Sequence, residues 1–274
     1  MTPPDLPPLR DVIRKHALTA RKSLGQHFLL DLNLTKRIVR TAGDLTDCHV
    51  IEVGPGPGGL TRALLNSPAL TVTVVEKDDR CLAVMEDLKT AYGDRLRIVA
   101  ADAMETDIPA LTSPPRKIVA NLPYNVGTPL FLRWLREIGA YRGLTLMFQA
   151  EVAERLMAQP QTKAYGRLSV ITQWLCEVHS AFNVSKDAFT PPPKVASTVS
   201  NLTPLPAPLA SVPFEAMETV TATAFGQRRK MLRTSLKSLD LDLAALEIDP
   251  TARAEELSIM DFCQLARALV ESRA

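Results

Sequence analysis

Cysteine and histidine are scarce in this chain of 274 residues, and neither is clustered. No C-x-x-C pair and no histidine spacing typical of metal ligands occurs among Cys48, Cys81, Cys176, Cys263, His16, His27, His49 and His179. Cysteines scattered in this way predict free thiols in a reducing cytosol and argue against a zinc site or a disulfide framework. We therefore expect a cytoplasmic protein without a bound metal.

The sequence also lacks a long apolar run. None approaches the ~20 residues that a transmembrane helix needs. The N-terminus has no apolar core of a signal peptide, and Asp5 and Asp11 argue against a transit peptide. We expect no membrane partner.

An excess of charge of one sign is missing too. The net charge is only +2, so a nucleic-acid partner must be bound by a local group of cations. A hydrophobic content of 46% with 23% charged residues is ordinary for a globular protein, and the length fits one large domain plus a small one. We expect a monomer.

The most informative stretch that is present is Asn121-Leu122-Pro123-Tyr124. It follows a short apolar run, residues 117–120, which predicts a buried parallel strand. Thr128 and Pro129 then favour a helix start, with Thr128 as the N-cap. The four residues therefore lie on a loop at the carboxyl end of a strand, where open α/β sheets bind ligands.

This loop offers two hydrogen-bond acceptors beside an aromatic ring. The acceptors are the side-chain carbonyl of Asn121 and the main-chain carbonyl of Leu122, which Pro123 holds extended; the ring is that of Tyr124. Such a set suits a planar amine, such as the exocyclic nitrogen of a nucleobase, whose lone pair is delocalised into the ring. Hydrogen bonds to its protons return electron density to the nitrogen and orient it. An ordinary turn explains these four residues equally well.

A glycine-rich turn, residues 54–59, lies between a strand predicted at 49–53 and a helix predicted at 60–65. Glycines in such a turn let the main chain approach a ligand closely. The spacing also fits the G-x-G-x-x-G pattern of dinucleotide-binding proteins. Glu76 ends the next predicted strand, where it can accept from both ribose hydroxyls of NAD or of S-adenosylmethionine.

Polar residues at successive strand ends favour the methyl donor. Asp102 follows a third predicted strand, residues 96–101, and can accept from an adenine amino group. Glu52, Glu76, Asp102 and Asn121 together mark four strand ends. Nucleoside methyltransferases have this layout, and NAD enzymes do not need it.

Cations gather at two places in the chain. Residues 1–22 are rich in proline and then basic. The first nine predict a solvated tail, and the basic part is expected to contact phosphate once the chain docks elsewhere. Residues 203–213 contain four prolines and read as a linker to a helical C-terminal segment. Its run at 226–237 holds five cations amid acidic neighbours, which suits a phosphate-rich partner.

Five segments, taken in this order, resemble the ribosomal RNA adenine dimethyltransferase family: residues 25–29, 52–58, 121–125, 189–195 and 224–233. The resemblance covers nearly the whole chain from Lys22 onward. It implies a doubly wound, seven-stranded, Rossmann-like α/β methyltransferase domain at 23–203. It also implies a small all-helical domain for docking on RNA or the ribosome at 204–274, with residues 1–22 as a basic tail.

The resemblance implies transfer of methyl groups from S-adenosylmethionine to the N6 of two adjacent adenosines near the 3′ end of 16S rRNA, in the small ribosomal subunit, with a role in ribosome biogenesis. The run at 227–233 resembles the small-subunit branch more than the branch that methylates one 23S rRNA adenosine. An assembly checkpoint factor that acts mainly by binding the subunit is an alternative.

The resemblance also implies roles for individual residues. The implied cofactor contacts are His27, Leu29, Gly54, Gly56, Glu76, Asp102, Ala103 and Asn121; many members carry asparagine at the position of His27. Catalysis falls to residues 121–124, and Tyr124 and Phe189 are the candidates to hold a flipped base. The implied RNA contacts are Arg21, Lys22, Arg228, Arg229, Lys230 and Arg233.

Overall fold

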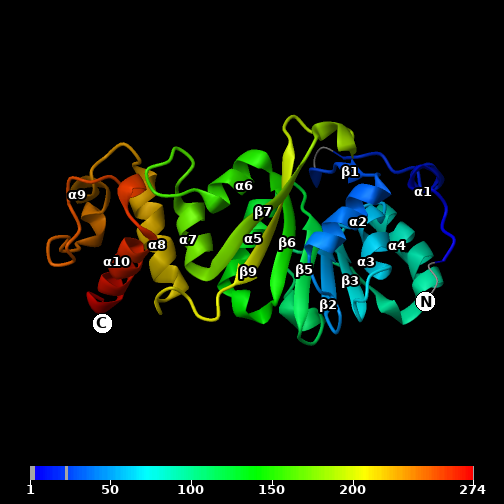
Figure 1. The fold of residues 1–274 in the computed structure, drawn as a ribbon, viewed down its shortest axis with the longest axis horizontal. Coiled ribbons are helices and arrows are strands. Elements are labelled where there is room, and N and C mark those ends of the chain that lie inside the picture. The colour runs from blue at the N-terminus through cyan, green and yellow to red at the C-terminus, as the bar shows by residue number, and fades with distance from the viewer. Residues whose placement is uncertain (1–3, 22–23, 274) are drawn as a thin grey trace. The chain divides into compact units, whose positions relative to one another are not determined.

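The computed structural model describes residues 4–21 and 24–273, and Lys22, an expected RNA contact, lies outside them. Seven strands form one sheet in the order β4-β3-β2-β5-β6-β9-β7 (Figure 1). Pairing is parallel from β4 to β6, and β9 is antiparallel to β6. The strands are β2 (His49–Val53), β3 (Thr71–Glu76), β4 (Leu96–Ala100), β5 (Arg116–Asn121), β6 (Gly143–Gln149), β7 (Cys176–Val184) and β9 (Ser197–Pro204). The predicted seven-stranded α/β fold is confirmed.

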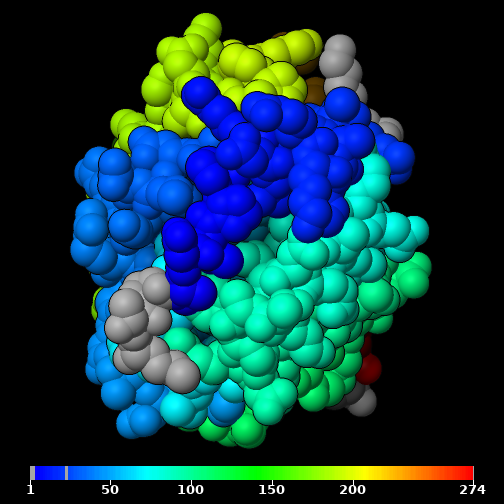
Figure 2. All heavy atoms as spheres, turned by 90° about the vertical axis from the view of Figure 1, so that its right-hand side faces the viewer, coloured from blue at the N-terminus to red at the C-terminus, as the bar shows by residue number. Residues whose placement is uncertain are grey.

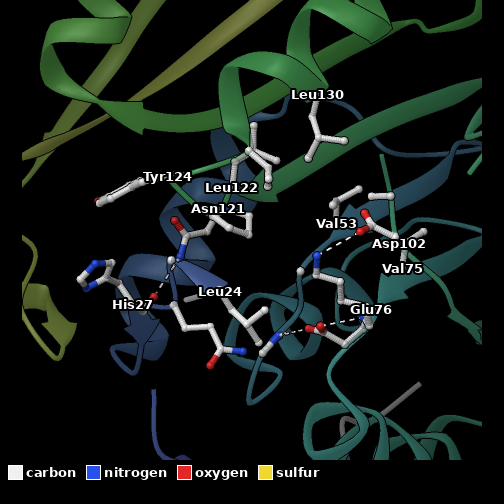
Figure 3. A pocket seen from close by; sticks show the side chains of 18 of the residues that line it. Leu24, His27, Val53, Val75, Glu76, Asp102, Asn121, Leu122, Tyr124 and Leu130 are labelled. Atoms are coloured by element: carbon white, nitrogen blue, oxygen red, sulfur yellow. Dashed lines mark hydrogen bonds and ion pairs between the residues drawn. The ribbon is translucent and has the colours of Figure 1, made fainter. Parts of the chain in front are cut away.

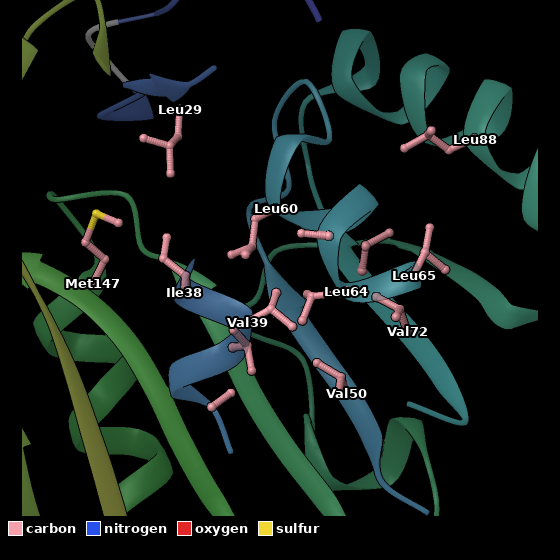
Figure 4. Packing of buried hydrophobic residues seen from close by; sticks show 14 of the residues in the cluster. Leu29, Ile38, Val39, Val50, Leu60, Leu64, Leu65, Val72, Leu88 and Met147 are labelled. Atoms are coloured by element: carbon pink, nitrogen blue, oxygen red, sulfur yellow. The ribbon is translucent and has the colours of Figure 1, made fainter. Parts of the chain in front are cut away.

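Helices pack their apolar faces on the parallel strands. In α2 (Leu32–Thr41) the buried residues Ile38 and Val39 lie on one face, toward α3 (Gly59–Leu65). They join a hydrophobic cluster with residues of α3, β2 and β3 and with Leu88 of α4 (Asp79–Tyr92) (Figure 4). Central strands are buried on both faces, which explains why they read as continuous apolar runs. This core fixes the strand ends on which the polar residues sit.

The N-terminal segment is not the solvated tail that its composition predicts. It forms α1 (Leu9–Lys15), whose Leu9 and Val12 are buried. Figure 2 shows this segment lying across the surface built by α3 and α4. Lys15 pairs with Asp87 of α4 at 2.6 Å, and the Arg62 guanidinium donates to the Pro7 carbonyl at 2.7 Å. Apolar residues among the prolines and cations decide this packing.

Two short strands join distant segments of the chain. In β1 (Phe28–Leu29) and β8 (Phe189–Thr190), Phe28 pairs with Thr190 and Leu29 with Phe189, antiparallel. The segments 25–29 and 189–195, which carry much of the family resemblance, therefore lie side by side.

Helix α5 (Gly127–Arg136) begins earlier than predicted. Its N-cap is Val126, which makes no side-chain capping bond, so Thr128 is not the N-cap. The turn is instead closed by main-chain bonds, because the amides of Val126 and Gly127 both donate to the Pro123 carbonyl. The helix thus grows directly out of the loop at 121–124.

The chain divides into two compact units: the described residues up to Ala150 with His179–Thr203, and Glu151–Val178 with the described residues from Pro204 onward. Residues 151–178 therefore group with the C-terminal segment, although the resemblance places them in the methyltransferase domain. They hold α6 (Ala150–Met157) and α7 (Arg167–Leu175), which are tied together by bonds from Gln173 to the Leu156 and Ala158 carbonyls. In turn α7 packs on α8 (Phe214–Gly226) and α10 (Ile259–Glu271).

The segment interpreted as a linker is tied to the second unit. The amides of Leu205 and Leu209 donate to carbonyls of α7, and the Trp174 indole donates to the Ala210 carbonyl at 2.9 Å. Within the C-terminal segment that the sequence predicts to be helical, α9 spans only Leu232–Ser235, and a 3-10 turn follows it.

Candidate functional site

A pocket of about 740 Å³, part of it open to solvent, lies at the carboxyl ends of β2, β3 and β5. The predicted site residues His27, Gly54, Gly56, Glu76, Asp102, Ala103 and Asn121 line it, together with Leu122, Pro123 and Tyr124 (Figure 3). Strand ends that are far apart in the sequence meet here because parallel strands end at the same edge of the sheet.

Glu76 is the central acid of the pocket. Its Oε1 accepts from the amides of Lys77 and Asp78, both at 2.9 Å, and its Oε2 accepts from the Gly56 amide at 3.4 Å. Burial raises the pKa of Glu76, while these three amides act in the opposite direction. The amides orient this carboxylate at the pocket wall, and the long bond from Gly56 leaves Oε2 best able to accept from the hydroxyls of a ligand.

The prediction that Glu52 lines the edge of the sheet with Glu76, Asp102 and Asn121 is wrong. Glu52 is 2% exposed, lies outside the pocket lining and accepts from the Thr61 hydroxyl at 2.7 Å. Successive side chains of β2 point to opposite faces of the sheet, so Val53 lines the pocket and Glu52 does not. Burial raises the pKa of Glu52 to about 8.

Glu52→Gln is expected to change how stability depends on pH. The pKa of Glu52 is about 8 in the folded state and near the usual 4.5 in the unfolded state. Between pH 4.5 and pH 8 the folded state therefore keeps a proton that the unfolded state has lost. The free energy of unfolding should therefore fall with rising pH, by up to about 1.4 kcal/mol per pH unit in this window. Glutamine keeps an acceptor for Thr61 and should remove this contribution. Denaturant titrations at pH 5 and pH 8 give the free energy of unfolding at each pH. If this free energy changes equally with pH in the unaltered protein and in Glu52→Gln, Glu52 is not a buried neutral acid.

Asp102 is held at the pocket wall by two contacts. Its Oδ1 accepts from the Met104 amide at 2.9 Å, and its Oδ2 lies 3.0 Å from the Lys77 ammonium. The Met104 amide first, and then Lys77, lower the pKa of Asp102. Arg133 of α5 donates to the carbonyls of Ala103 and Met104 and so fixes this loop from behind.

Asn121 ends β5 and lies beside the His27 loop. Its Nδ2 donates to the His27 carbonyl at 3.4 Å (Figure 3). With its amino group turned to the main chain, its Oδ1 stays available as an acceptor. The carbonyl predicted to accept from an amine is therefore presented in the pocket.

Tyr124 lies half-buried across the pocket from Glu76 (Figure 3). Its ring centroid is 5.2 Å from that of His27, with 33° between the planes, and its hydroxyl bonds the Ser197 hydroxyl. The His27 Nδ1 is 2.8 Å from the Pro191 carbonyl. A rigidly held aromatic face thus borders the open part of the site.

Glycines make close contacts between the loops possible. Gly25 has a φ of +62°, and a Cβ there would lie 2.6 Å from the Asn125 Oδ1. Gly54 has a φ of +70° and faces the Pro123 ring. Larger residues would push the loop at 121–125 away from the pocket floor.

Two predicted site residues lie in the hydrophobic core instead. Phe189 is 2% exposed, and Leu29 is 5% exposed; both belong to the main hydrophobic cluster and neither lines the pocket. In this structure Phe189 therefore presents no open face to the pocket, and its role in holding a flipped base stays a prediction. Its pairing through β8 with Leu29 orders the wall of the site from behind.

The expected RNA contacts differ in their surroundings. Arg228 is engaged within its own unit: its Nε bonds Glu255 at 2.7 Å, and its Nη2 donates to the Lys163 carbonyl at 2.7 Å. In contrast, Arg229, Lys230 and Arg233 are exposed, as is Arg21 of the first unit.

Several pocket residues were not among the predicted site residues. Val75, Val126 and Leu130 supply apolar walls, and Lys77 and Gln26 supply polar ones. Gln26 bonds the Asp78 carboxylate at 2.9 Å, and the clamp of Arg80 on Asp78 lowers the pKa of that acid to about 2. Gln26 and Asp78 are far apart in the chain, so no local sequence pattern could have predicted their contact.

A model of the family described as "Ribosomal RNA adenine dimethylase" matches residues 17–271. The chain belongs to the ribosomal RNA adenine dimethylase family. It is 61% identical to "Ribosomal RNA small subunit methyltransferase A" of Paramagnetospirillum magneticum over 97% of this chain and 95% of the relative. It is also 56% identical to the protein of the same name from Rhodospirillum rubrum, over 98% of this chain and 94% of that relative.

Two solved structures, of a dimethyladenosine transferase and of an rRNA methyltransferase, share the fold. A dimethyladenosine transferase from Plasmodium falciparum has a TM-score of 0.76 at 25% identity, covering 87% of this chain and 96% of that one. The 23S rRNA methyltransferase ErmE has a TM-score of 0.66 at 27% identity, covering 89% and 99%.

No cluster of side chains able to hold a metal ion occurs among the described residues. Within the same residues, none of the helices has the length and apolar character needed to cross a membrane.

Proposed function

We propose that this dimethylase transfers methyl groups from S-adenosylmethionine to the N6 of two adjacent adenosines near the 3′ end of 16S rRNA in the small ribosomal subunit. The observation that carries the proposal is the juxtaposition of Glu76, Asp102 and the loop at 121–124 around one pocket. Relatives named for the small subunit, at 61% and 56% identity, favour that substrate over 23S rRNA.

The donor set of the pocket fits S-adenosylmethionine. The Glu76 carboxylate, oriented by three amides, would accept from the two ribose hydroxyls, and the carboxylate of Asp102 from the adenine amino group. Val53, Val75 and Leu130 provide apolar surfaces for the flat base. When bound, this cofactor supplies an electrophilic methyl group.

The loop at 121–124 positions the acceptor nitrogen. The Asn121 Oδ1 and the Leu122 carbonyl would accept from the N6 protons of a flipped adenine, which localises and aims the lone pair. The Tyr124 ring offers the stacking surface. No general base is needed, because the methylated ammonium loses its proton to water.

A labelling experiment tests the proposed substrate. The purified protein would be incubated with tritiated methyl donor and with small subunits lacking the two dimethyladenosines. We expect four labelled methyl groups per subunit on two adjacent adenosines, and none with large subunits. Label on 23S rRNA alone would replace this proposal with the single-site one.

The exposed cations of the C-terminal run and Arg228 should behave differently. Arg229→Ala with Lys230→Ala should weaken small-subunit binding and lower the slope of log affinity against log salt by about one unit for each phosphate that is no longer neutralised. Arg228→Ala should instead destabilise the fold by roughly 1 kcal/mol, because its bonds lie within the protein. Subunit binding at several salt concentrations and thermal unfolding are measured for both variants. A thermal midpoint of Arg228→Ala equal to that of the unaltered protein would refute the structural role of Arg228.

A second candidate function is an assembly checkpoint, in which binding to the immature subunit is the main task and methylation releases the protein. Its support is that Arg229 and Lys230 belong to one compact unit and the pocket to the other, so docking and chemistry are separable. Expression of Glu76→Ala in a deletion strain grown in the cold distinguishes the checkpoint function from methyl transfer. Growth worse than deletion alone supports the checkpoint, and growth equal to deletion rejects it.

A further inference from the structure

Helix α2 carries cations on its exposed face and no acid. Lys36, Arg37 and Arg40 are exposed, whereas Ile38 and Val39 on the opposite face are buried in the core. The helix sequence from Leu32 to Thr41 contains neither Asp nor Glu. This group of three cations is called the α2 stripe below.

The α2 stripe has no carboxylate partner. Among the described residues the side chains of Lys36 and Arg40 form no hydrogen bond or ion pair. The nearby Asp31 is engaged as the N-cap and accepts from the amides of Asn33 and Leu34. Like charges at i and i+4 destabilise a helix by a few tenths of a kcal/mol, so the stripe costs stability in the isolated protein.

Several other cations of the same unit are satisfied within the protein. Lys15 pairs with Asp87, Arg80 with Asp78, and the Lys117 ammonium donates to the Ala42 carbonyl. In α5, Arg133 donates to main-chain carbonyls. Lys36 and Arg40 differ from these cations, because their side chains bond neither a carboxylate nor a main-chain carbonyl among the described residues.

Arg37 is held in place without being neutralised. Its guanidinium carbon lies 3.9 Å from the centroid of the Phe182 ring of β7. Such stacking leaves the N–H groups at the guanidinium edge free to bind phosphate oxygens. Lys36 and Arg40 lie beside it on the same exposed face, separated by about 6 Å along the helix axis.

We infer that the α2 stripe binds the sugar-phosphate backbone of the substrate rRNA, as a docking surface on the catalytic unit that is separate from the cationic run of the second unit. The inference rests on the proposed rRNA substrate. The connection to the site is short: α2 closely follows β1, and His27, which lines the pocket, directly precedes β1. RNA held on the stripe would therefore be bound to an element that closely follows the pocket wall in the chain.

The test compares two double variants that each remove two exposed cations of the first unit. Lys36→Ala with Arg40→Ala removes two cations of the stripe, and Arg10→Ala with Lys89→Ala is the matched control. Binding to unmethylated small subunits is measured from 0.05 to 0.3 M salt. The stripe variant should lose roughly tenfold in affinity at 0.1 M salt and about 1.5 units of salt slope, and the control should match the unaltered protein.

Two further readouts separate docking from folding and catalysis. The thermal midpoint of the stripe variant should equal or exceed that of the unaltered protein, because repulsion is removed. Its affinity for S-adenosylmethionine and its rate at saturating subunit should not change. If both double variants show the same salt slope, the inference is overturned. If the unaltered protein itself neither binds nor methylates subunits, the proposed function fails instead.

A crosslink identifies the occupant. All four native cysteines are buried, so Arg40→Cys can be labelled selectively with a photo-crosslinker. We expect crosslinks to 16S rRNA. Crosslinks only to ribosomal proteins would overturn the assignment to the RNA backbone.

Discussion

Asn121→Ala should reduce single-turnover methyl transfer at least about a hundredfold while leaving the fold intact. The effect is large because the variant removes an acceptor that acts on the reacting nitrogen itself, where one preorganised hydrogen bond typically contributes a factor of about 10² to 10³. The structural cost is small, since the side chain makes one bond of 3.4 Å to the His27 carbonyl. Rapid-quench transfer with saturating subunits, alongside thermal unfolding, gives both quantities.

Variants at Tyr124 provide the matched comparison. Tyr124→Phe keeps the aromatic face and removes only the bond to Ser197, so it should retain much of the activity. Tyr124→Ala removes the face and should not. A normal rate in Asn121→Ala would refute lone-pair steering, and equal rates in the two Tyr124 variants would refute stacking.

Glu76→Ala should weaken binding of S-adenosylmethionine by roughly 2 kcal/mol or more, about 30-fold, because it removes hydrogen bonds to a charged group. Affinity for small subunits should not change. Calorimetry with the methyl donor and with NAD measures the effect and also tests the cofactor. Tight NAD binding without binding of the methyl donor would refute the assignment.

Affinity for the cofactor should also depend on pH in a defined direction. Under the proposed function the ionised form of Glu76 accepts from the ribose hydroxyls, and burial raises the pKa of Glu76 above the usual 4.5. Acidification should therefore weaken binding at a higher pH than it would with an exposed carboxylate. Glu76→Gln, which does not titrate, should show a flat profile over the same range and serves as the control.

The order of strands along the chain and the positions of Glu76, Asp102 and Asn121 at their ends were predictable from the sequence. Apolar β-branched runs, glycine turns and polar residues directly after a strand are local signals. The helical content of residues 214–226 and 259–271 was predictable for the same reason. Local signals also misled, as at residues 4–21, where prolines and cations outweighed the few leucines and valines that are buried.

By itself, then, the sequence determined the fold class and the places of Glu76, Asp102 and the loop at 121–124 at the ends of strands, because each is marked by residues adjacent in the chain. Only the tertiary structure decided which acids face the pocket and which lie behind it, as Glu76 and Glu52 do. It also placed Phe189 in the core, gave Arg228 its internal partner Glu255, and left the α2 stripe without a carboxylate partner. Burial and pairing depend on residues far apart in the chain, and these meet only when the sheet and its helices have packed.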